Sequence, residues 1–154
     1  MFLPTPLNLP AYPFRITEIN NQLYIFDKLR KKKLLLTPEE WVRQHFVQFL
    51  IIDKKYPKTL IKLEGGVVIN KQLNRTDILV YNKLGKPIIL IECKASTIKI
   101  NQEVFNQASR YNTLHQVKYL VVSNGLNHYC CEIDYEKQNY TFLQELPSYN
   151  KLQW

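Results

Sequence analysis

The segment Ile88–Lys94 (IILIECK) constrains the fold of this chain more than any other feature. Its four consecutive apolar residues, Ile88–Ile91, are typical of a central strand covered on both faces, because a half-solvated strand would alternate apolar and polar residues. The strand then carries two charges, Glu92 and Lys94, which project to the same face because they lie two residues apart. An unpaired buried charge is strongly unfavourable, so these two groups require a partner or a metal ion.

The remaining sequence predicts the elements that cover this strand. Thr37 is suited to cap a helix from about 38 to 52, with Pro38 in the first turn and Glu40 three residues after the cap. A second helical pattern runs from about 101 to 115. Strand patterns occur at 14–27 (two short strands around Asn20 and Asn21), 59–63, 67–70, 76–81, 87–94, 117–123, 128–134 and 140–143. This order predicts an α/β fold with a mixed central sheet flanked by helices.

The first 14 residues are apolar but contain four prolines, at Pro4, Pro6, Pro10 and Pro13. They lack a basic start and an unbroken apolar run, so they do not resemble a signal peptide or a membrane helix. Proline fixes φ and removes a hydrogen-bond donor, which favours an extended arm on the surface. We therefore expect residues 1–154 to form a single domain that begins with this arm, residues 1–14, and a small hairpin, and that has no membrane partner.

The charge of the chain favours a polyanionic partner. The 21 basic and 13 acidic residues give a net charge of +8 and a pI near 9.4. Nucleic acid and an anionic membrane both fit this balance, although basic surfaces also serve solubility. The densest basic run, Lys28–Lys33, is either a solvated loop or a patch that contacts phosphates. The three cysteines show no disulfide framework and no zinc-ligand spacing, so we expect reduced cysteines in a cytoplasmic protein.

Asp77 adds a second carboxylate close to Glu92 and Lys94. A hairpin loop at 82–86 joins the strand that begins near Asp77 to the strand that ends in Glu92, so both carboxylates are expected side by side at one end of the sheet. Two close carboxylates repel each other, and Mg²⁺ removes this repulsion because it prefers oxygen ligands. Such an ion can bind a scissile phosphate and activate water, while Lys94 orients that water or offsets charge on the phosphate. The alternative is a structural Glu92–Lys94 pair, with Asp77 capping a turn.

Several segments together carry a family resemblance. They are Thr37–Gln44, Arg75–Val80, Gly85–Ala95, Gln107–Tyr111 and Val121–Gly125. In combination they resemble the N-terminal nuclease domain of type I restriction enzyme R subunits, which belongs to the PD-(D/E)xK restriction-endonuclease-like superfamily. The resemblance covers about residues 30–146, and it implies a restriction-endonuclease-like fold.

The resemblance also implies roles for the charged residues. Asp77 matches the aspartate of the motif, although Thr76 stands where the nominal motif has proline. Glu92 and Lys94 match the (D/E)xK element. Asp77 and Glu92 would hold the metal ion, and Lys94 would support the attacking water.

Two further pairs follow from the same resemblance. A helix acid commonly assists such a metal site, and Glu40 is the expected residue with Glu39 as the competitor; alternatively, Glu40 is only the capping-box partner of Thr37. Gln107 and Tyr111 match a QxxxY motif found beside this site in related nucleases, and their spacing of four places them on one helix face. That face either meets DNA or steadies Lys94; the alternative is that it serves ordinary packing.

The function implied is a Mg²⁺-dependent deoxyribonuclease, more an endonuclease than an exonuclease, in which Mn²⁺ substitutes for Mg²⁺. Basic residues would hold the DNA backbone in a salt-sensitive, mostly sequence-independent manner. The candidates are Lys31, Lys32, Lys33, Arg75, Lys99 and Arg110.

The sequence carries no Walker motif and no helicase domains, so we expect no ATP-driven translocation by this chain. The expected partners are DNA, a specificity or motor subunit, and a second copy in a homodimer. The alternative function is a catalytically silent module that binds nucleic acid or serves assembly while retaining the nuclease fold.

Overall fold

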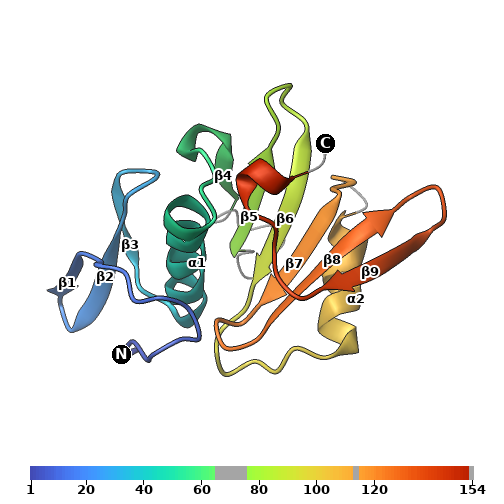
Figure 1. Ribbon diagram of the computed structural model, residues 1–154. Coiled ribbons are helices and arrows are strands. Elements are labelled where there is room, and N and C mark those ends of the chain that lie inside the picture. The colour runs from blue at the N-terminus through green and yellow to red at the C-terminus, as the bar shows by residue number, and fades with distance from the viewer. Residues whose placement is uncertain (65–75, 113–114, 153–154) are drawn as a thin grey trace.

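A computed structural model describes residues 1–64, 76–112 and 115–152 of the chain. A small sheet lies on one side of helix α1 (Pro38–Gln48), and a large sheet lies on its other side (Figure 1). The small sheet contains β1 (Ile16–Ile19), β2 (Gln22–Asp27) and β3 (Lys32–Leu35). The large sheet contains β4 (Ile61–Glu64), β5 (Thr76–Tyr81), β6 (Pro87–Cys93), β7 (Tyr119–Ser123), β8 (His128–Asp134) and β9 (Asn139–Leu143).

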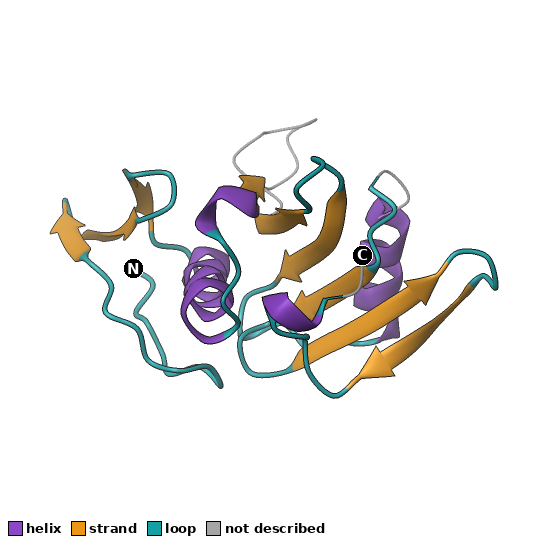
Figure 2. Ribbon diagram, turned by 45° about the horizontal axis from the view of Figure 1, so that its top comes forward, coloured by secondary structure: helices purple, strands orange, loops and turns teal. Residues whose placement is uncertain are grey.

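The six strands of the large sheet are neighbours in chain order, from β4 to β9. All pairs are antiparallel except β6 and β7, which are parallel. A parallel pair needs a crossover connection, and α2 (Gln102–Asn112) supplies it. Helices α1 and α2 lie on opposite sides of the sheet (Figure 2). The mixed central sheet flanked by helices, with an N-terminal arm and hairpin, is confirmed.

Strand β6 has the covered, central position that its apolar run predicts. Ile89 and Ile91 are fully buried in the cluster that also contains Val42 and Phe46 of α1. Leu90, between them, is fully buried in the second cluster, which contains Phe105 of α2. Successive side chains of a strand point to opposite faces, so each helix covers one face of β6.

Helix α1 begins where its sequence signals predict. The Glu40 N–H donates to Thr37 Oγ1 at 3.1 Å, and Pro38 occupies the first turn. The helix continues into a π-helical turn, η1 (Phe49–Asp53), so the helical region ends close to the predicted residue 52. Two short 3₁₀ helices, η2 (Lys58–Leu60) and η3 (Tyr149–Lys151), complete the described elements.

Some predicted elements differ from the structure. Part of the basic run forms β3. This strand forms because Leu34 pairs with the buried Ile25 of β2 and becomes partly buried. The lysines before Leu34 make this apolar signal hard to recognise in the sequence. The strand predicted at 59–63 begins instead with η2 and becomes β4 at Ile61. The strand predicted at 67–70 lies outside the described residues.

The buried carboxylate of Asp27 holds the turn between β2 and β3. Asp27 is fully buried and accepts hydrogen bonds from the backbone N–H groups of Leu29 and Arg30 at 2.9 Å and from Arg30 Nε at 2.8 Å. Burial alone would raise the pKa of Asp27, but the hydrogen bonds and charge of Arg30, with a further hydrogen bond from Gln44 of α1, hold it below its ordinary value. The lowered pKa means that ionised Asp27 stabilises the folded state.

We expect Asp27→Asn to lower the free energy of unfolding at pH 7 by about 1–3 kcal/mol, because the charge-assisted hydrogen bonds are lost. The difference between wild type and variant should persist above the ordinary pKa of 3.8 and shrink as the pH falls below it, since the wild-type carboxylate then becomes protonated. Urea unfolding followed by circular dichroism at several pH values measures both. A difference that does not change with pH would contradict the assigned role.

The N-terminal arm is attached to the turn after β7. The Asn8 N–H donates to the Gly125 carbonyl at 2.8 Å, and His128 Nε2 donates to the Asn8 carbonyl at 2.9 Å. Gly125 has a φ of +85°, and a Cβ atom there would lie 2.8 Å from a methyl group of Leu7. Glycine is therefore required at this turn both by the backbone and by the arm that packs on it.

Gly85 offers a matched control, because its φ is +82° and an added Cβ would have no neighbour within 4 Å. We expect Gly85→Ala to cost about 1–2 kcal/mol from the backbone alone. Gly125→Ala should cost more and should expose the arm to limited proteolysis, because the arm must move away. Equal losses of stability in both variants, with an intact arm, would show that Leu7 accommodates the methyl group without cost.

Candidate active site

Three acidic positions form a row across the first strands of the large sheet. Asp77 of β5 pairs with Glu92 of β6, and Glu64 of β4 pairs with Asp77 on its other side. Positions paired in this way share one face of a sheet. The loop between β5 and β6 lies at the top of Figure 1, so this acidic row lies at the opposite end of these strands. The side chains of Glu64 and Asp77 lie outside the described part of the structure.

The carboxylate of Glu92 is almost entirely buried, with 6% of the residue exposed. Lys94 Nζ lies 3.2 Å from Glu92 Oε1. Glu92 Oε2 is also buried, but no hydrogen-bond partner for it exists among the described residues. The charge of Glu92 is therefore compensated at one oxygen, and the second oxygen is suited to a cation or a donor.

The face on which Glu92 lies follows from its neighbours. Ile91 and Cys93 pack in the cluster on the α1 side of the sheet, so Glu92 points to the side that α2 covers. Lys94 follows β6 directly, and its N–H donates to the Ser123 carbonyl of β7 at 2.8 Å. This bond fixes the backbone from which the ammonium group extends toward Glu92.

Glu40, the expected helix acid, is buried and engaged within α1. Its carboxylate accepts hydrogen bonds from Arg43 Nε at 2.8 Å, from a second nitrogen of Arg43, and from Gln44 Nε2 at 3.0 Å. Its backbone N–H also completes the helix cap with Thr37. The competitor Glu39 is only partly buried. Within the described residues, which omit the Asp77 side chain, no three His, Cys, Asp or Glu groups lie close enough together to hold a metal ion.

The Glu40–Arg43–Gln44 network and the acidic position Glu64 were both missed by the sequence reasoning. Arg43 and Gln44 lie three and four residues after Glu40, and this spacing brings helix side chains together, so it offered a usable signal. Arg43 is buried, and its Nη1 has no partner among the described residues. Glu64 gave no comparable signal, since only the pairing of β4 with β5 places it beside Asp77.

The other expected site residues lie on the surface or outside the description. Gln107 is exposed on α2, and Tyr111 lies one turn later on the same helix, with its side chain outside the described residues. Exposed basic residues are Lys31, Lys32, Lys33, Lys99 and Arg110. Arg75 lies outside the described residues.

The cysteines are structural thiols. Cys93, Cys130 and Cys131 are buried and form no disulfide. Burial raises the pKa of Cys130 to about 12 and that of Cys131 to about 11, so both remain protonated at neutral pH. Thiolate ligands and a thiolate nucleophile are therefore poor candidates at these two positions.

The mixed six-stranded sheet with a helix on each face makes this chain a restriction-endonuclease-like α/β domain. The model of the family described as type I restriction enzyme R protein N terminus matches residues 38–147, and the chain belongs to this family. No curated protein matched the chain. The matched range agrees with the resemblance seen in the sequence over about residues 30–146. Membership makes the chain a nuclease-like module of restriction-enzyme type, for which DNA is the implied partner.

The structure contains no membrane-crossing helix within its described ranges, since none there is both long and apolar enough.

The Glu92–Lys94 pair can be tested through stability in the absence of metal. We expect Lys94→Met to lower the free energy of unfolding by about 1–3 kcal/mol, because it leaves a buried carboxylate without its cation. The double variant Glu92→Gln/Lys94→Met should recover most of this loss, since no buried charge remains. Urea unfolding in EDTA measures all three proteins. A Lys94→Met variant as stable as wild type would show that the pair is not a buried ion pair in solution.

Proposed function

We propose that this chain is a Mg²⁺-dependent deoxyribonuclease that hydrolyses phosphodiester bonds, with Mn²⁺ able to substitute and endonucleolytic cleavage favoured. The observation that supports it most is Glu92: a buried carboxylate that faces Asp77 across the ladder and retains one oxygen without a partner among the described residues. Because a buried, half-compensated carboxylate is unfavourable, its presence at the end of an otherwise apolar strand argues for a ligand.

The donor set fits a hard divalent cation. Asp77 and Glu92 would supply carboxylate oxygens, which Mg²⁺ prefers. The third acid is either Glu40, with Glu39 as its competitor, as the family resemblance suggests, or Glu64, as the strand register suggests. Of these, Glu64 shares the sheet face of Glu92, whereas α1 covers the opposite face. When bound, such an ion would lower the pKa of a coordinated water and offset charge on the scissile phosphate.

Lys94 would assist from the protein side. Its ammonium group has three donors, of which one is directed to Glu92 Oε1. Its side chain is 30% exposed, so the remaining donors can reach a water molecule or a phosphate oxygen. In a partly buried site, a fixed positive charge stabilises the negative charge that develops on the phosphate during hydrolysis.

Contacts away from the reacting phosphate would come from the basic surface. Lys31, Lys32 and Lys33 on the β2–β3 hairpin, together with Lys99, Arg110 and Arg75, would bind the DNA backbone, and this binding would weaken with salt. Gln107, exposed on α2, with Tyr111 one turn later, would contact DNA near Lys94. The proposal also includes assembly with a specificity or motor subunit, formation of a homodimer, and a cytoplasmic location for the chain.

A specific observation favours a second function. The carboxylate of Glu40 is fully engaged by Arg43 and Gln44, so one expected metal ligand is committed to packing within α1. A module in which this engagement is permanent would bind nucleic acid or serve assembly without cleaving DNA.

Cleavage of supercoiled plasmid in Mn²⁺ or Mg²⁺ tests the proposal. We expect nicking by wild type and a loss of about 100-fold or more in Asp77→Asn, Glu92→Gln and Lys94→Ala, because each removes a ligand or a charge used in the reaction. Glu136→Gln, at an exposed position in the turn after β8, is the matched control and should cleave normally. Comparison of Glu40→Gln with Glu64→Gln identifies the third acid, since the variant that loses activity and metal-induced thermal stabilisation contained the ligand.

Cleavage that survives in both Glu92→Gln and Lys94→Ala would refute the site. DNA binding without cleavage by the wild type in either metal ion would favour the silent module.

A further inference from the structure

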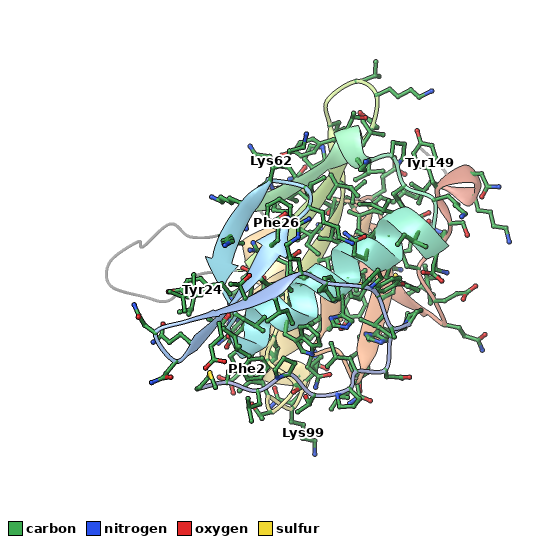
Figure 3. All side chains as sticks on the ribbon, turned by 90° about the vertical axis from the view of Figure 1, so that its left-hand side faces the viewer. Phe2, Tyr24, Phe26, Lys62, Lys99 and Tyr149 are labelled. Carbon is green, nitrogen blue, oxygen red and sulfur yellow. The ribbon has the colours of Figure 1, made fainter. Side chains whose placement is uncertain are left out.

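In the described part of the structure, the small N-terminal sheet has one face that points away from α1 and is partly exposed. Ile25 and Asp27 of β2 are fully buried and point toward α1. Because side chains alternate along a strand, Tyr24 and Phe26 point away from α1. Figure 3 looks onto this side of the molecule, with Tyr24 and Phe26 on the strands in front of α1. We call this surface the outer sheet face; it consists of Arg15, Thr17, Ile19, Gln22, Tyr24, Phe26, Lys33 and Leu35.

Two partly exposed aromatic rings, Tyr24 and Phe26, occupy the middle strand of the outer sheet face. Tyr24 lies between Thr17 of β1 and Leu35 of β3, and Leu35 is 46% exposed. Two residues further along β2, Phe26 pairs with Lys33. Rings two residues apart on a strand are spaced by about 6.8 Å, so each can serve as a separate platform.

The charge of the outer sheet face is positive only. Arg15 places its guanidinium 5.0 Å from the centre of the Phe26 ring, and Lys33 is exposed on the other side of that ring. The two acidic residues of these strands, Glu18 and Asp27, occupy alternate positions on the opposite face. Arg15 and Lys33 therefore flank the Phe26 ring, and no acidic residue of these strands lies on the same face to neutralise them.

A second aromatic surface shows the contrast. Tyr140 and Phe142 of β9 are about half exposed and pack with Phe105 of α2 at centroid distances near 5.5 Å. On β8 the residues paired with these rings, Ile133 and Cys131, are uncharged. This aromatic surface therefore provides a control for exposed aromatic area without paired cations.

We propose that the outer sheet face binds single-stranded DNA, with bases stacked on Tyr24 and Phe26 and a phosphate held by Lys33. Aromatic rings on a sheet, flanked by cations, bind unpaired bases because every base offers a flat face for stacking while the cations attract the backbone. Paired bases in a duplex do not present these faces. The proposal deepens the proposed nuclease function, on which it rests for DNA as the partner, by naming unpaired strands as a form of DNA that the domain holds.

Fluorescence anisotropy with a labelled oligo-dT strand in EDTA tests binding separately from cleavage. We expect Tyr24→Ala/Phe26→Ala to bind at least about 10-fold more weakly than wild type, because stacking on both rings is lost. Tyr24→Phe should bind like wild type, since it keeps the ring. The matched control Tyr140→Ala/Phe142→Ala should also bind like wild type. Duplex DNA of equal length should compete poorly.

A single substitution at the exposed Lys33 tests the proposal with little effect on folding. Lys33→Gln should fold like wild type by circular dichroism and should reduce the dependence of log binding constant on log salt by about 0.7. Unchanged binding in both Lys33→Gln and Tyr24→Ala/Phe26→Ala would overturn the proposal. A loss of binding in the β9 control, or equal competition by duplex DNA, would also overturn it. Binding that follows these expectations without any plasmid cleavage would refute the proposed nuclease activity and leave the binding face intact.

Discussion

The contact between Glu92 and Lys94 is the constraint on which the rest of the structure depends. A carboxylate at the end of a fully covered strand can persist only if something compensates its charge, and the nearby ammonium group compensates one of its two oxygens. The surrounding fold makes this position possible. Pairing with β5 and β7 fixes β6, and helices on both faces keep water from its apolar part. The same shielding strengthens any electrostatic interaction at the strand end.

Much of this arrangement could be predicted from the sequence, because it depends on local patterns. The unbroken apolar run before Glu92 identified the central strand, and the Thr37–Pro38 pair identified the start of α1. Strand β3 was obscured, because Lys32 and Lys33 conceal the burial that Leu34 gains by pairing with Ile25. The family match over 38–147 supports the inferred class of protein, whereas the roles of individual residues at the site remain proposals.

Part of the remainder depends on tertiary contacts that no local pattern contains. Glu64 becomes a neighbour of Asp77 only when β4 pairs with β5. Glu40 has the sequence position of a capping-box residue, yet its carboxylate is directed to Arg43 and Gln44 rather than back to the cap. Gln44 in turn reaches Asp27, so the polar network of α1 extends to the small sheet. Buried networks of this kind specify how layers pack, and they couple residues that the sequence separates.

The attachment of the N-terminal arm has a consequence for the order in which the chain can fold. Asn8 bonds to Leu126 and His128, which lie 118 and 120 residues later in the chain. During synthesis the arm leaves the ribosome before the turn that receives it, which is made 118 to 120 residues later. Contacts between such distant positions close late, because the large loop between them must first lose its freedom. The arm is therefore among the last of the described segments to reach its native place.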